Sequence, residues 1–390
     1  MPSGSTVSLV RSISTPHELC AGSCGLHVTA AAARYLNICA NTVATFASQA
    51  TSCDVLYPCM KHRKTQAADC LAGKRAMPKP SWRVWVCMCI QQASLLTITA
   101  QSDLSDTSNL LQTGWAAQTG WNTSQDMCTW TGISCSQGRA TAIELEIFSV
   151  TGSLPESWGR LPQLSVINLT KGGDGSALTG SLPESWSKLS LLNTLVLSDQ
   201  SLTGTLPVVY STLAELTTLD LSNNLLTGSL PSAYSNLTKL EELDLHGNYL
   251  NHSLPQSWGE LYQVRVMSLW DNSLTGGLPD SWNKLNSLHI LDMSLNYFEG
   301  PLPQAWGNMS ALSELWLNAN SLTGSLLESW SNLTSLSMLY LGGNALSGTI
   351  PALTSGSWPQ VYLISLANNM LTGSLPASWA ALPMAQTFHI

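Results

Sequence analysis

The chain of 390 residues has little charge and lacks the motifs on which common enzymes depend. Asp, Glu, Lys and Arg make up 10% of it, against about a quarter in an average soluble domain. Its 7 His form no metal-spaced pair, and neither a phosphate-binding loop nor a G-x-S-x-G nucleophile motif occurs. A solvated acidic face accounts for the paired acids Glu241 and Glu242 better than acid–base catalysis does. We therefore expect a non-catalytic protein with no cofactor and no metal.

The sequence also lacks an apolar run long enough for a membrane-spanning helix. Its best candidate, residues 84–90, is short and is followed by the polar pair Gln91-Gln92. With Lys79 and Arg83 before this run and the small residue Ala100 after it, we interpret residues 77–100 as a signal peptide. Residues 1–76 are then a poorly structured, Cys-containing extension or are not translated. We expect no transmembrane segment.

Acidic and basic residues are divided unevenly along the chain. Residues 1–100 hold nine Lys or Arg and three Asp or Glu, which leaves seven basic and 21 acidic residues for 101–390, out of totals of 16 and 24. A basic head therefore precedes an acidic body. Net acidity over the larger part of the chain argues against a nucleic-acid partner.

A period of twenty-four residues decides the fold class. It places seven residues in one column, and each opens a copy of the pattern LxxLxxLxLxxNxLTGxLPxxW: Leu189, Leu213, Leu237, Leu261, Leu285, Met309 and Leu333. Segments such as 219–221 alternate apolar and polar residues, which predicts a strand with one buried face. The period lengthens at the glycine-rich insertion 172–175 and at residues 354–357, where the usual Trp is missing and we expect a deformable turn.

Two columns of the repeat predict packing between coils. The Asn column, which includes Asn224 and Asn248, must satisfy buried amides, so we expect it to bond the backbone of neighbouring coils as a ladder. The aromatic column includes Trp158, Tyr234 and Trp282, and we interpret it as a spine that packs coil on coil.

These motifs resemble those of plant-type leucine-rich-repeat proteins. Residues 128–135 read CTWTGISC, similar to the C-x-W-x-G-[IV]-x-C centre of the plant N-terminal cap, and the LTGSLP phrase resembles the LxGxIP signature. The LPxSW variant looks more like the repeats of green-algal proteins. The resemblance implies an α/β-type solenoid, a right-handed superhelix with a parallel sheet on the concave face and a second short sheet on one flank. It assigns 101–139 to the cap and 140–390 to about nine full repeats, and it implies ligand recognition without catalysis.

Within this family's cap, Cys128 and Cys135 are expected to form a disulfide that closes the edge of the first coil. A disulfide implies an oxidising compartment, and six N-x-[ST] sequons agree with secretion, at Asn122, Asn168, Asn236, Asn251, Asn308 and Asn332. We expect an extracellular or cell-surface protein. The alternative is an intracellular scaffold in the cytoplasm, the cytoskeleton or a ciliary axoneme.

The residues that flank the strand leucines on the concave face form the candidate ligand site. They are Asp220, Glu242, Asp244, His246, Trp270, Asp271, Asp292, Glu314, Trp316 and Tyr340. Asp between the leucines is also ordinary in this repeat type, so Asp220, Asp244 and Asp292 can be there for the repeat alone. Trp270 and Trp316 are predicted to be large exposed aromatics beside charged residues, a combination that is typical of interface hot spots and sugar-binding platforms. The predicted partner is a protein, a peptide or a cell-wall glycan.

The end of the sequence predicts an uncapped solenoid. Leu382, Ala385, Phe388 and Ile390 begin a further repeat, and no C-terminal cap follows. Apolar strand residues would then lie at an open edge. We expect either a truncated product or a subunit that stacks end to end.

Overall fold

A computed structural model describes residues 106–111, 115–147, 150–171, 177–354, 356–382 and 387–389. The predicted extension 1–76, the predicted signal peptide 77–100 and the insertion 172–175 lie outside these residues. All described residues belong to one compact unit, Gln92–Ile390. None of the helices in the described ranges is long and apolar enough to cross a membrane.

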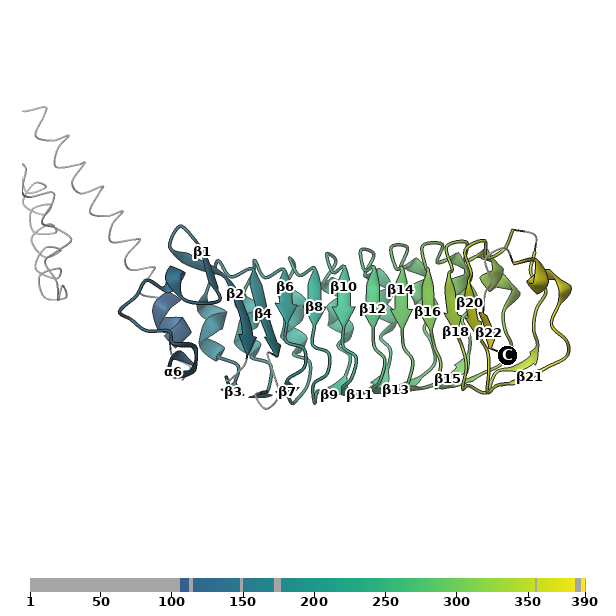
Figure 1. The fold of residues 1–390 in the computed structure, drawn as a ribbon, viewed down its shortest axis with the longest axis horizontal. Helices are drawn as coiled ribbons and strands as arrows, with labels where there is room; N and C mark the ends of the chain where they lie inside the picture. The colour runs from purple at the N-terminus through teal and green to yellow at the C-terminus, as the bar shows by residue number, and fades with distance from the viewer. Residues whose placement is uncertain are drawn as a thin grey trace, which may run out of the picture. The chain divides into compact units, whose positions relative to one another are not determined.

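The largest element is a sheet of twelve strands, to which each repeat contributes one strand (Figure 1). Its strands, in spatial order, are β1 (Ile133–Ser136), β2 (Arg139–Ile147), β4 (Val166–Lys171), β6 (Thr194–Val196), β8 (Thr218–Asp220), β10 (Glu242–Asp244), β12 (Val266–Ser268), β14 (Ile290–Asp292), β16 (Glu314–Trp316), β18 (Met338–Tyr340), β20 (Leu363–Ser365) and β22 (Thr387–His389). The pairing of β1 with β2 is antiparallel and the others are parallel. Equivalent repeat positions face each other, as Leu219 faces Leu243, so the spacing predicted from the sequence sets the register.

Shorter parallel sheets follow the large sheet along each coil. One joins β3 (Gly152–Ser153), β5 (Leu178–Gly180) and β7 (Ser201–Leu202), and one joins β19 (Ser347–Thr349) and β21 (Met370–Thr372). The third has five strands: β9 (Thr227–Ser229), β11 (Tyr249–Ser253), β13 (Ser273–Gly276), β15 (Tyr297–Pro301) and β17 (Ser321–Thr323). The second sheet that the family resemblance implied is therefore present in three pieces.

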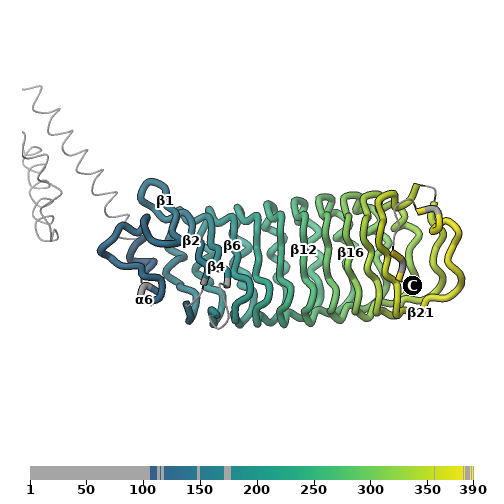
Figure 2. The backbone as a smooth tube through the Cα atoms, in the orientation of Figure 1, coloured from purple at the N-terminus to yellow at the C-terminus, as the bar shows by residue number. Residues whose placement is uncertain are grey.

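In most coils, which Figure 2 traces one after another, a short 3-10 helix precedes the return of the chain to the large sheet; the coil between β19 and β20 has none among its described residues. These helices are η2 (Glu156–Arg160), η3 (Glu184–Lys188), η4 (Val208–Thr212), η5 (Ser232–Asn236), η6 (Gln256–Glu260), η7 (Asp280–Lys284), η8 (Gln304–Asn308), η9 (Glu328–Asn332) and η10 (Ala377–Ala381). Most of them begin after a proline, whose fixed φ suits the residue that precedes a helix. The third residue of each is aromatic.

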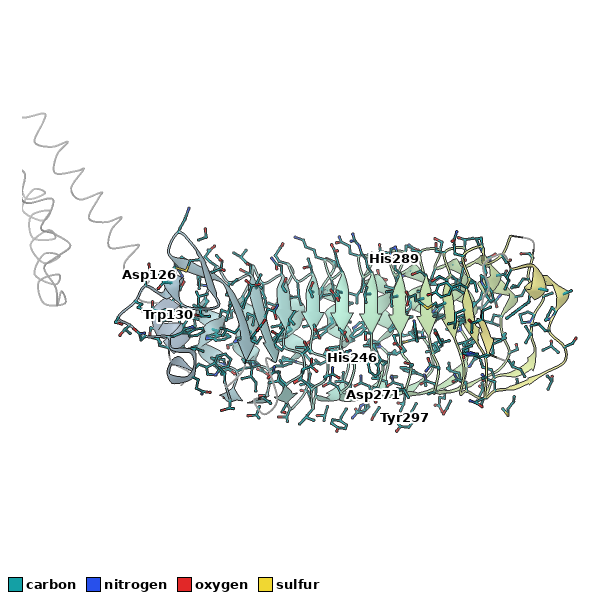
Figure 3. The ribbon with its side chains drawn as sticks, viewed as in Figure 1. Asp126, Trp130, His246, Asp271, His289 and Tyr297 are labelled. Atoms are coloured by element: carbon teal, nitrogen blue, oxygen red, sulfur yellow. A yellow bond between two sulfur atoms is a disulfide. The ribbon has the colours of Figure 1, made fainter. Side chains whose placement is uncertain are left out.

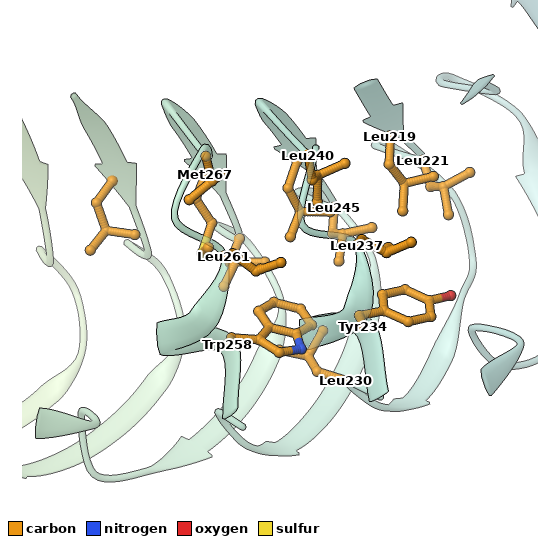
Figure 4. Close-up of a cluster of buried hydrophobic side chains, with 14 of the residues drawn as sticks. Leu219, Leu221, Leu230, Tyr234, Leu237, Leu240, Leu245, Trp258, Leu261 and Met267 are labelled. Carbon is orange, nitrogen blue, oxygen red and sulfur yellow. The ribbon is translucent and has the colours of Figure 1, made fainter. Parts of the chain in front are cut away.

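The core is a continuous stack of the repeated apolar residues (Figure 4). Leu219, Leu243 and Met267 are fully buried at one position of three successive strands. On the opposite side, the predicted aromatic spine is confirmed. Trp258 and Trp282 stack with ring centroids 6.3 Å apart, and the Trp282 Nε1–H donates to the Pro255 carbonyl at 3.0 Å.

The predicted Asn ladder is also confirmed. In each ladder residue one amide group joins two coils. The Asn248 Nδ2 donates to the Leu221 carbonyl of the preceding coil at 3.0 Å, and its Oδ1 accepts from the Leu226 N–H at 3.0 Å. A buried amide that satisfies both donors and acceptor in this way ties consecutive coils at a fixed spacing.

The N-terminal cap closes the first coil. It contains α6 (Ala116–Thr119) and η1 (Met127–Thr129), and Cys128 and Cys135 form the predicted disulfide. Trp121 and Trp130 stack 5.5 Å apart in the cap. Asp106 is fully buried, and its carboxylate accepts from the Arg139 Nε–H at 2.8 Å, which supplies the partner that a buried charge needs.

The coil that lacks the usual spine Trp is filled by a different residue, which the sequence did not reveal. The repeat pattern aligns Trp358 with the residues that open each repeat, yet its side chain is buried and its Nε1–H donates to the Trp330 carbonyl at 2.8 Å. Its ring meets Trp379 edge-on, with centroids 5.6 Å apart. Trp358 therefore bridges the gap in the spine from a different sequence position.

The uncapped-edge prediction stays a prediction. Leu382 is half-buried, and β22 pairs with β20 as the last described strand of the large sheet. The side chains of Ala385, Phe388 and Ile390 lie outside the described residues.

Candidate ligand-binding face

The site predicted from the sequence lies on what we call the open face, the side of β8 to β18 that points away from the core. In β8, β12, β14, β16 and β18 the middle residue is buried and its two neighbours are half-buried, while in β10 Glu242 is exposed. Because strand side chains alternate, the flanking residues of every strand share this one face. Parallel strands lie about 4.8 Å apart, so residues at the same repeat position form contiguous rows across the coils.

Aspartates occupy one such row, and each binds the turn that follows its strand. The Asp220 Oδ1 accepts from the Ser222 N–H at 3.0 Å and from its hydroxyl at 2.6 Å. Asp292 bonds Ser294 in the same way, at 2.9 and 2.7 Å. These bonds show why the repeat favours Asp here for its turn, but they leave the other carboxylate oxygen of each Asp available on the open face.

The pKa of Asp292 is shifted in the folded chain. Desolvation raises the pKa of Asp292, and this outweighs the lowering by its hydrogen bonds to Ser294 and by the charge of His246. The nearby Asp244 also raises the pKa of Asp292 through charge repulsion. The carboxylates of Asp244 and Asp292 therefore act on one another across the intervening strand, where Ser268 occupies the equivalent position.

His246 belongs to the same group. Its Nδ1 lies 2.6 Å from the Asp244 Oδ1, and its ring stacks on the Trp270 indole with centroids 4.5 Å apart. Trp270 is half-buried rather than fully exposed. The sequence placed these residues on one face but did not indicate that one ring covers another.

A second pair of rings lies further along the open face. Trp316 and Tyr340 stack with centroids 3.9 Å apart, and the Trp316 Nε1–H donates to the Glu314 Oε2 at 3.3 Å. Burial raises the pKa of Tyr340 above its ordinary value, with smaller contributions from Tyr362 and Glu314. Both Trp316 and Tyr340 are half-buried. Like His246 with Trp270, they present two rings held against each other and not a single ring that projects into solvent.

Asp271 lies apart from the other predicted residues. It is exposed in the turn after β12 with φ +52, a position that Asn223 and Gly247 occupy in the two preceding coils. Asn and Gly tolerate this left-handed conformation, and their presence in the same column was a signal that the position is a turn. Asp271 therefore stands at the rim of the open face, as Figure 3 shows for its labelled side chain.

Arg265 borders the site and was not predicted from the sequence. It lies one residue before β12, and its Nη1 contacts the Glu241 Oε2 of the neighbouring coil at 3.3 Å. Both side chains are well exposed, so this ion pair contributes little stability but adds a positive charge at the upper margin of the open face. In the described ranges, no group of three or more His, Cys, Asp or Glu is arranged to hold a metal ion.

The predicted sequons divide by exposure. Asn122, Asn236, Asn308 and Asn332 are exposed, and Asn168 and Asn251 are half-buried. Asn236, Asn308 and Asn332 each end a 3-10 helix, on the part of the coil away from the open face. Asn168 belongs to β4, the third strand of the large sheet, and its Oδ1 is buried.

Comparison with known proteins identifies the repeat. Residues 181–250 match the family model for the leucine-rich repeat. No curated protein sequence matches the chain. The fold is a leucine-rich-repeat solenoid. Its Cys128–Cys135 disulfide and its sheet arrangement agree with the plant-type cap and repeats that the sequence resembled.

Solved structures of plant leucine-rich-repeat proteins share this fold. The plant peptide hormone receptor RGFR1 in complex with RGF2 is 29% identical (TM-score 0.59), and a TDR receptor is 33% identical (TM-score 0.59). The matches cover 62% and 63% of this chain but 38% and 41% of those receptors, so the chain spans about two fifths of their length. A plant ice-binding protein is 28% identical (TM-score 0.60), with 70% of this chain and 88% of that chain covered.

Proposed function

We propose that this leucine-rich-repeat chain recognises a protein or peptide on the open face of its large sheet, without catalysis. The observation that carries the proposal is the placement of two stacked ring pairs, His246 with Trp270 and Trp316 with Tyr340, beside a row of carboxylates. The likeness to a receptor structure that holds the hormone RGF2 supports a peptide as the ligand class.

The chemistry of the open face favours a basic ligand. Asp220, Asp244 and Asp292 supply negative charge in a region where Coulombic attraction is stronger than in bulk water. The ring pairs supply rigid apolar surface on which Lys or Arg side chains can pack through cation–π contacts. Because the rows belong to consecutive coils, an extended segment that runs along the stack would meet carboxylates and both ring pairs in turn, with the His246–Trp270 pair between Asp220 and Asp292 and the Trp316–Tyr340 pair beyond them.

We further propose that the protein works outside the cell or at its surface. The Cys128–Cys135 disulfide supports this location, since cytosolic thiols are kept reduced. An intracellular or ciliary scaffold remains the alternative. Free thiols at both positions in protein from its native source, together with empty sequons, would favour the scaffold.

Selection from a random peptide library tests the binding proposal. The immobilised full chain is expected to enrich peptides that contain Lys and Arg, and Trp270→Ala with Trp316→Ala should remove the enrichment. Tyr249→Ala with Tyr297→Ala, which alters exposed aromatics away from the open face, serves as the matched control and should enrich the same peptides. The proposal fails if the unaltered chain enriches nothing or if the Trp270/Trp316 double variant enriches the same peptides.

The hydroxyl rows of the smaller sheets favour a second candidate function. Thr179, Thr203 and Thr227 lie in one exposed column, and each is followed two residues later by an exposed Ser or Thr. Across neighbouring strands Thr179 pairs with Ser201 and Thr205 pairs with Thr227, so hydroxyls lie opposite each other at a strand spacing of about 4.8 Å and can hold surface water in a regular array. Together with the likeness to a plant ice-binding protein, this suggests ice binding. Thermal hysteresis in the presence of the chain tests it, and unchanged ice growth excludes it.

A further inference from the structure

The two ring pairs of the open face lie in different surroundings. His246 and Trp270 follow β10 and β12, whereas Trp316 and Tyr340 end β16 and β18. We call the open-face residues of β8 and β10, together with the first ring pair, the acidic end. Those of β16, β18 and β20 form the apolar end, which includes the second ring pair. The residues around each ring pair decide what that end can bind.

Carboxylates surround the first ring pair. Asp220 and Asp244 occupy paired positions of neighbouring strands, and Glu242 is exposed on the same face. Burial lowers the pKa of His246, but Asp244, Asp220 and Asp199 raise it by more, which shows that their charges act together on this ring. Neither β8 nor β10 contains a Lys or Arg. The acidic end therefore attracts a cation.

Apolar side chains surround the second ring pair. Met338 and Leu363 occupy paired positions of β18 and β20, and both are half-buried. Tyr362, one residue before β20, is 38% exposed. Glu314 is the single acid of these three strands, which contain no Lys or Arg, and its Oε2 accepts from the Trp316 Nε1–H. The apolar end therefore offers rings and aliphatic groups with little charge.

Between the two ends, the open face changes character in one row before the other. In the row of first strand residues, Glu242 pairs with Val266, and Val266 pairs with Ile290. In the row of last strand residues, Asp292 in β14 is still acidic and pairs with Trp316. β12 and β14 thus place aliphatic side chains beside a carboxylate. A ligand that crosses these strands passes from a mainly acidic to a mainly apolar surface.

The register fixes the distance between the two ends. Asp244 and Tyr340 occupy the same repeat position in β10 and β18, and residues at that position pair in turn through β12, β14 and β16 (Figure 1). Four strand spacings amount to about 19 Å. An extended peptide rises about 3.3 Å per residue, so about six residues span this distance.

We propose that the open face binds an extended peptide through two anchors of different kinds, a Lys or Arg at the acidic end and an apolar or aromatic residue at the apolar end, about six residues apart. This rests on the proposed function of the open face and specifies its ligand. The cationic group pairs with the carboxylates of Asp220 and Asp244, and its aliphatic stem packs on Trp270. The second anchor removes apolar surface of Trp316 and Tyr340 from water.

Each end discriminates against the other anchor. An apolar residue over Asp220 and Asp244 would take their carboxylates out of water without a partner. A Lys over Met338 and Leu363 would lose its own hydration to apolar side chains. Charge complementarity thus selects the first anchor, and the cost of burying a charge selects the second.

Selection with the full chain from a peptide library tests the two anchors and their spacing. Every peptide of the library contains one Arg and one Trp among small neutral residues, and the separation of the two is varied. Peptides with a separation of about six residues should be enriched over those in which the Arg and the Trp are adjacent. Replacing either residue of an enriched peptide by Ala should weaken binding by about tenfold, as measured by fluorescence anisotropy.

Double-mutant cycles assign each anchor to its end of the open face. Asp244→Asn combined with loss of the peptide Arg should weaken binding little more than either change alone, because both remove the same contact. Trp316→Ala and loss of the peptide Trp should behave in the same way, and Tyr340→Ala repeats this cycle with a second variant. The crossed combinations should have multiplicative effects. Melting temperatures show that each variant is folded before its binding is measured.

The outcomes for the anchors and for peptide binding itself are distinguishable. If the unaltered chain enriches no peptide from this library or from a random one, the proposed function and the two anchors both fail. The proposed function stands and the two anchors are overturned if peptides bind the open face whatever the separation of Arg and Trp. The same holds if Asp244→Asn couples to the peptide Trp as strongly as to its Arg.

Discussion

The imidazole of His246 and the carboxylate of Asp244 are joined by a contact of 2.6 Å between Nδ1 and Oδ1. Two residues of one chain segment are thereby fixed against each other while Trp270 covers the imidazole ring. Burial lowers the pKa of His246, but the hydrogen bond to Asp244 and the charges of Asp244, Asp220 and Asp199 outweigh it, and the pKa is raised above 6.5. The open face therefore has an imidazole whose pKa is raised by the carboxylates around it.

The first prediction concerns pH. Because the pKa of His246 is higher in the folded chain than in the unfolded chain, its contribution to stability is complete below about pH 6.5 and is lost as the pH rises through the folded value. The melting temperature of the parent should therefore fall relative to His246→Gln over that window. Scanning calorimetry between pH 5 and 9 measures this. Equal slopes for the parent and His246→Gln would contradict the assignment, and Asp244→Asn should flatten the slope as well.

The second prediction concerns the ladder residue Asn248. Replacing it with Ala leaves the Leu226 N–H without its acceptor and removes the donor to the Leu221 carbonyl, both buried. We expect the free energy of unfolding to fall by about 3 kcal/mol. The exposed Asn286, which makes no ladder bond, is the matched control, and Asn286→Ala should change stability by less than about 0.5 kcal/mol. Urea unfolding of both variants compares them, and equal midpoints would argue that the ladder bonds are not stabilising.

The third prediction uses the two kinds of residue in the aromatic spine. Trp282→Ala should cost about 3–5 kcal/mol, since it removes a fully buried ring and its bond to Pro255. Trp282→Tyr should cost less than half as much, because the Tyr234 hydroxyl already makes the equivalent bond to Pro207 at 3.1 Å. Denaturant midpoints measure both changes. A Tyr variant as unstable as the Ala variant would contradict the interchange of Tyr and Trp in the spine that Tyr234 indicates.

The repeat fold could be predicted from the sequence because one period of twenty-four residues determines the strands, their register and the core. A leucine at a given position of the repeat has the same neighbours in each coil, so Leu219 facing Leu243 follows from a spacing of twenty-four residues. The Asn and Trp columns followed for the same reason. Trp358 did not, because its side chain reaches the spine from a coil of irregular length, and only packing decides where such a ring can go.

The site was harder to predict because it depends on contacts between coils at variable positions. His246 and Trp270 are one period apart, as are Trp316 and Tyr340, so the register contained the signal for both stacked pairs. Which way each ring turns depends on its neighbours, and composition does not indicate that. Val266, Ile290 and Leu363 were missed, because an apolar residue next to a buried strand residue is ordinarily assigned to the core and not to a binding surface.

The last prediction connects exposure with the proposed extracellular location. Expression through the secretory pathway of a eukaryotic host should attach glycans to Asn236, Asn308 and Asn332, which are exposed at the ends of η5, η8 and η9. Asn168 should stay unmodified, because it is half-buried in β4 between β2 and β6.

Glycopeptide mass spectrometry decides between these sites. Removing the three exposed acceptors together, by Asn→Gln, should reduce the mass of the secreted protein to that of a chain with no glycan on these helices. Secretion should continue, because no side-chain contact of the core depends on these residues. A glycan on Asn168, or empty sites at all three helix ends in secreted protein, would contradict the exposure of these Asn side chains in this fold.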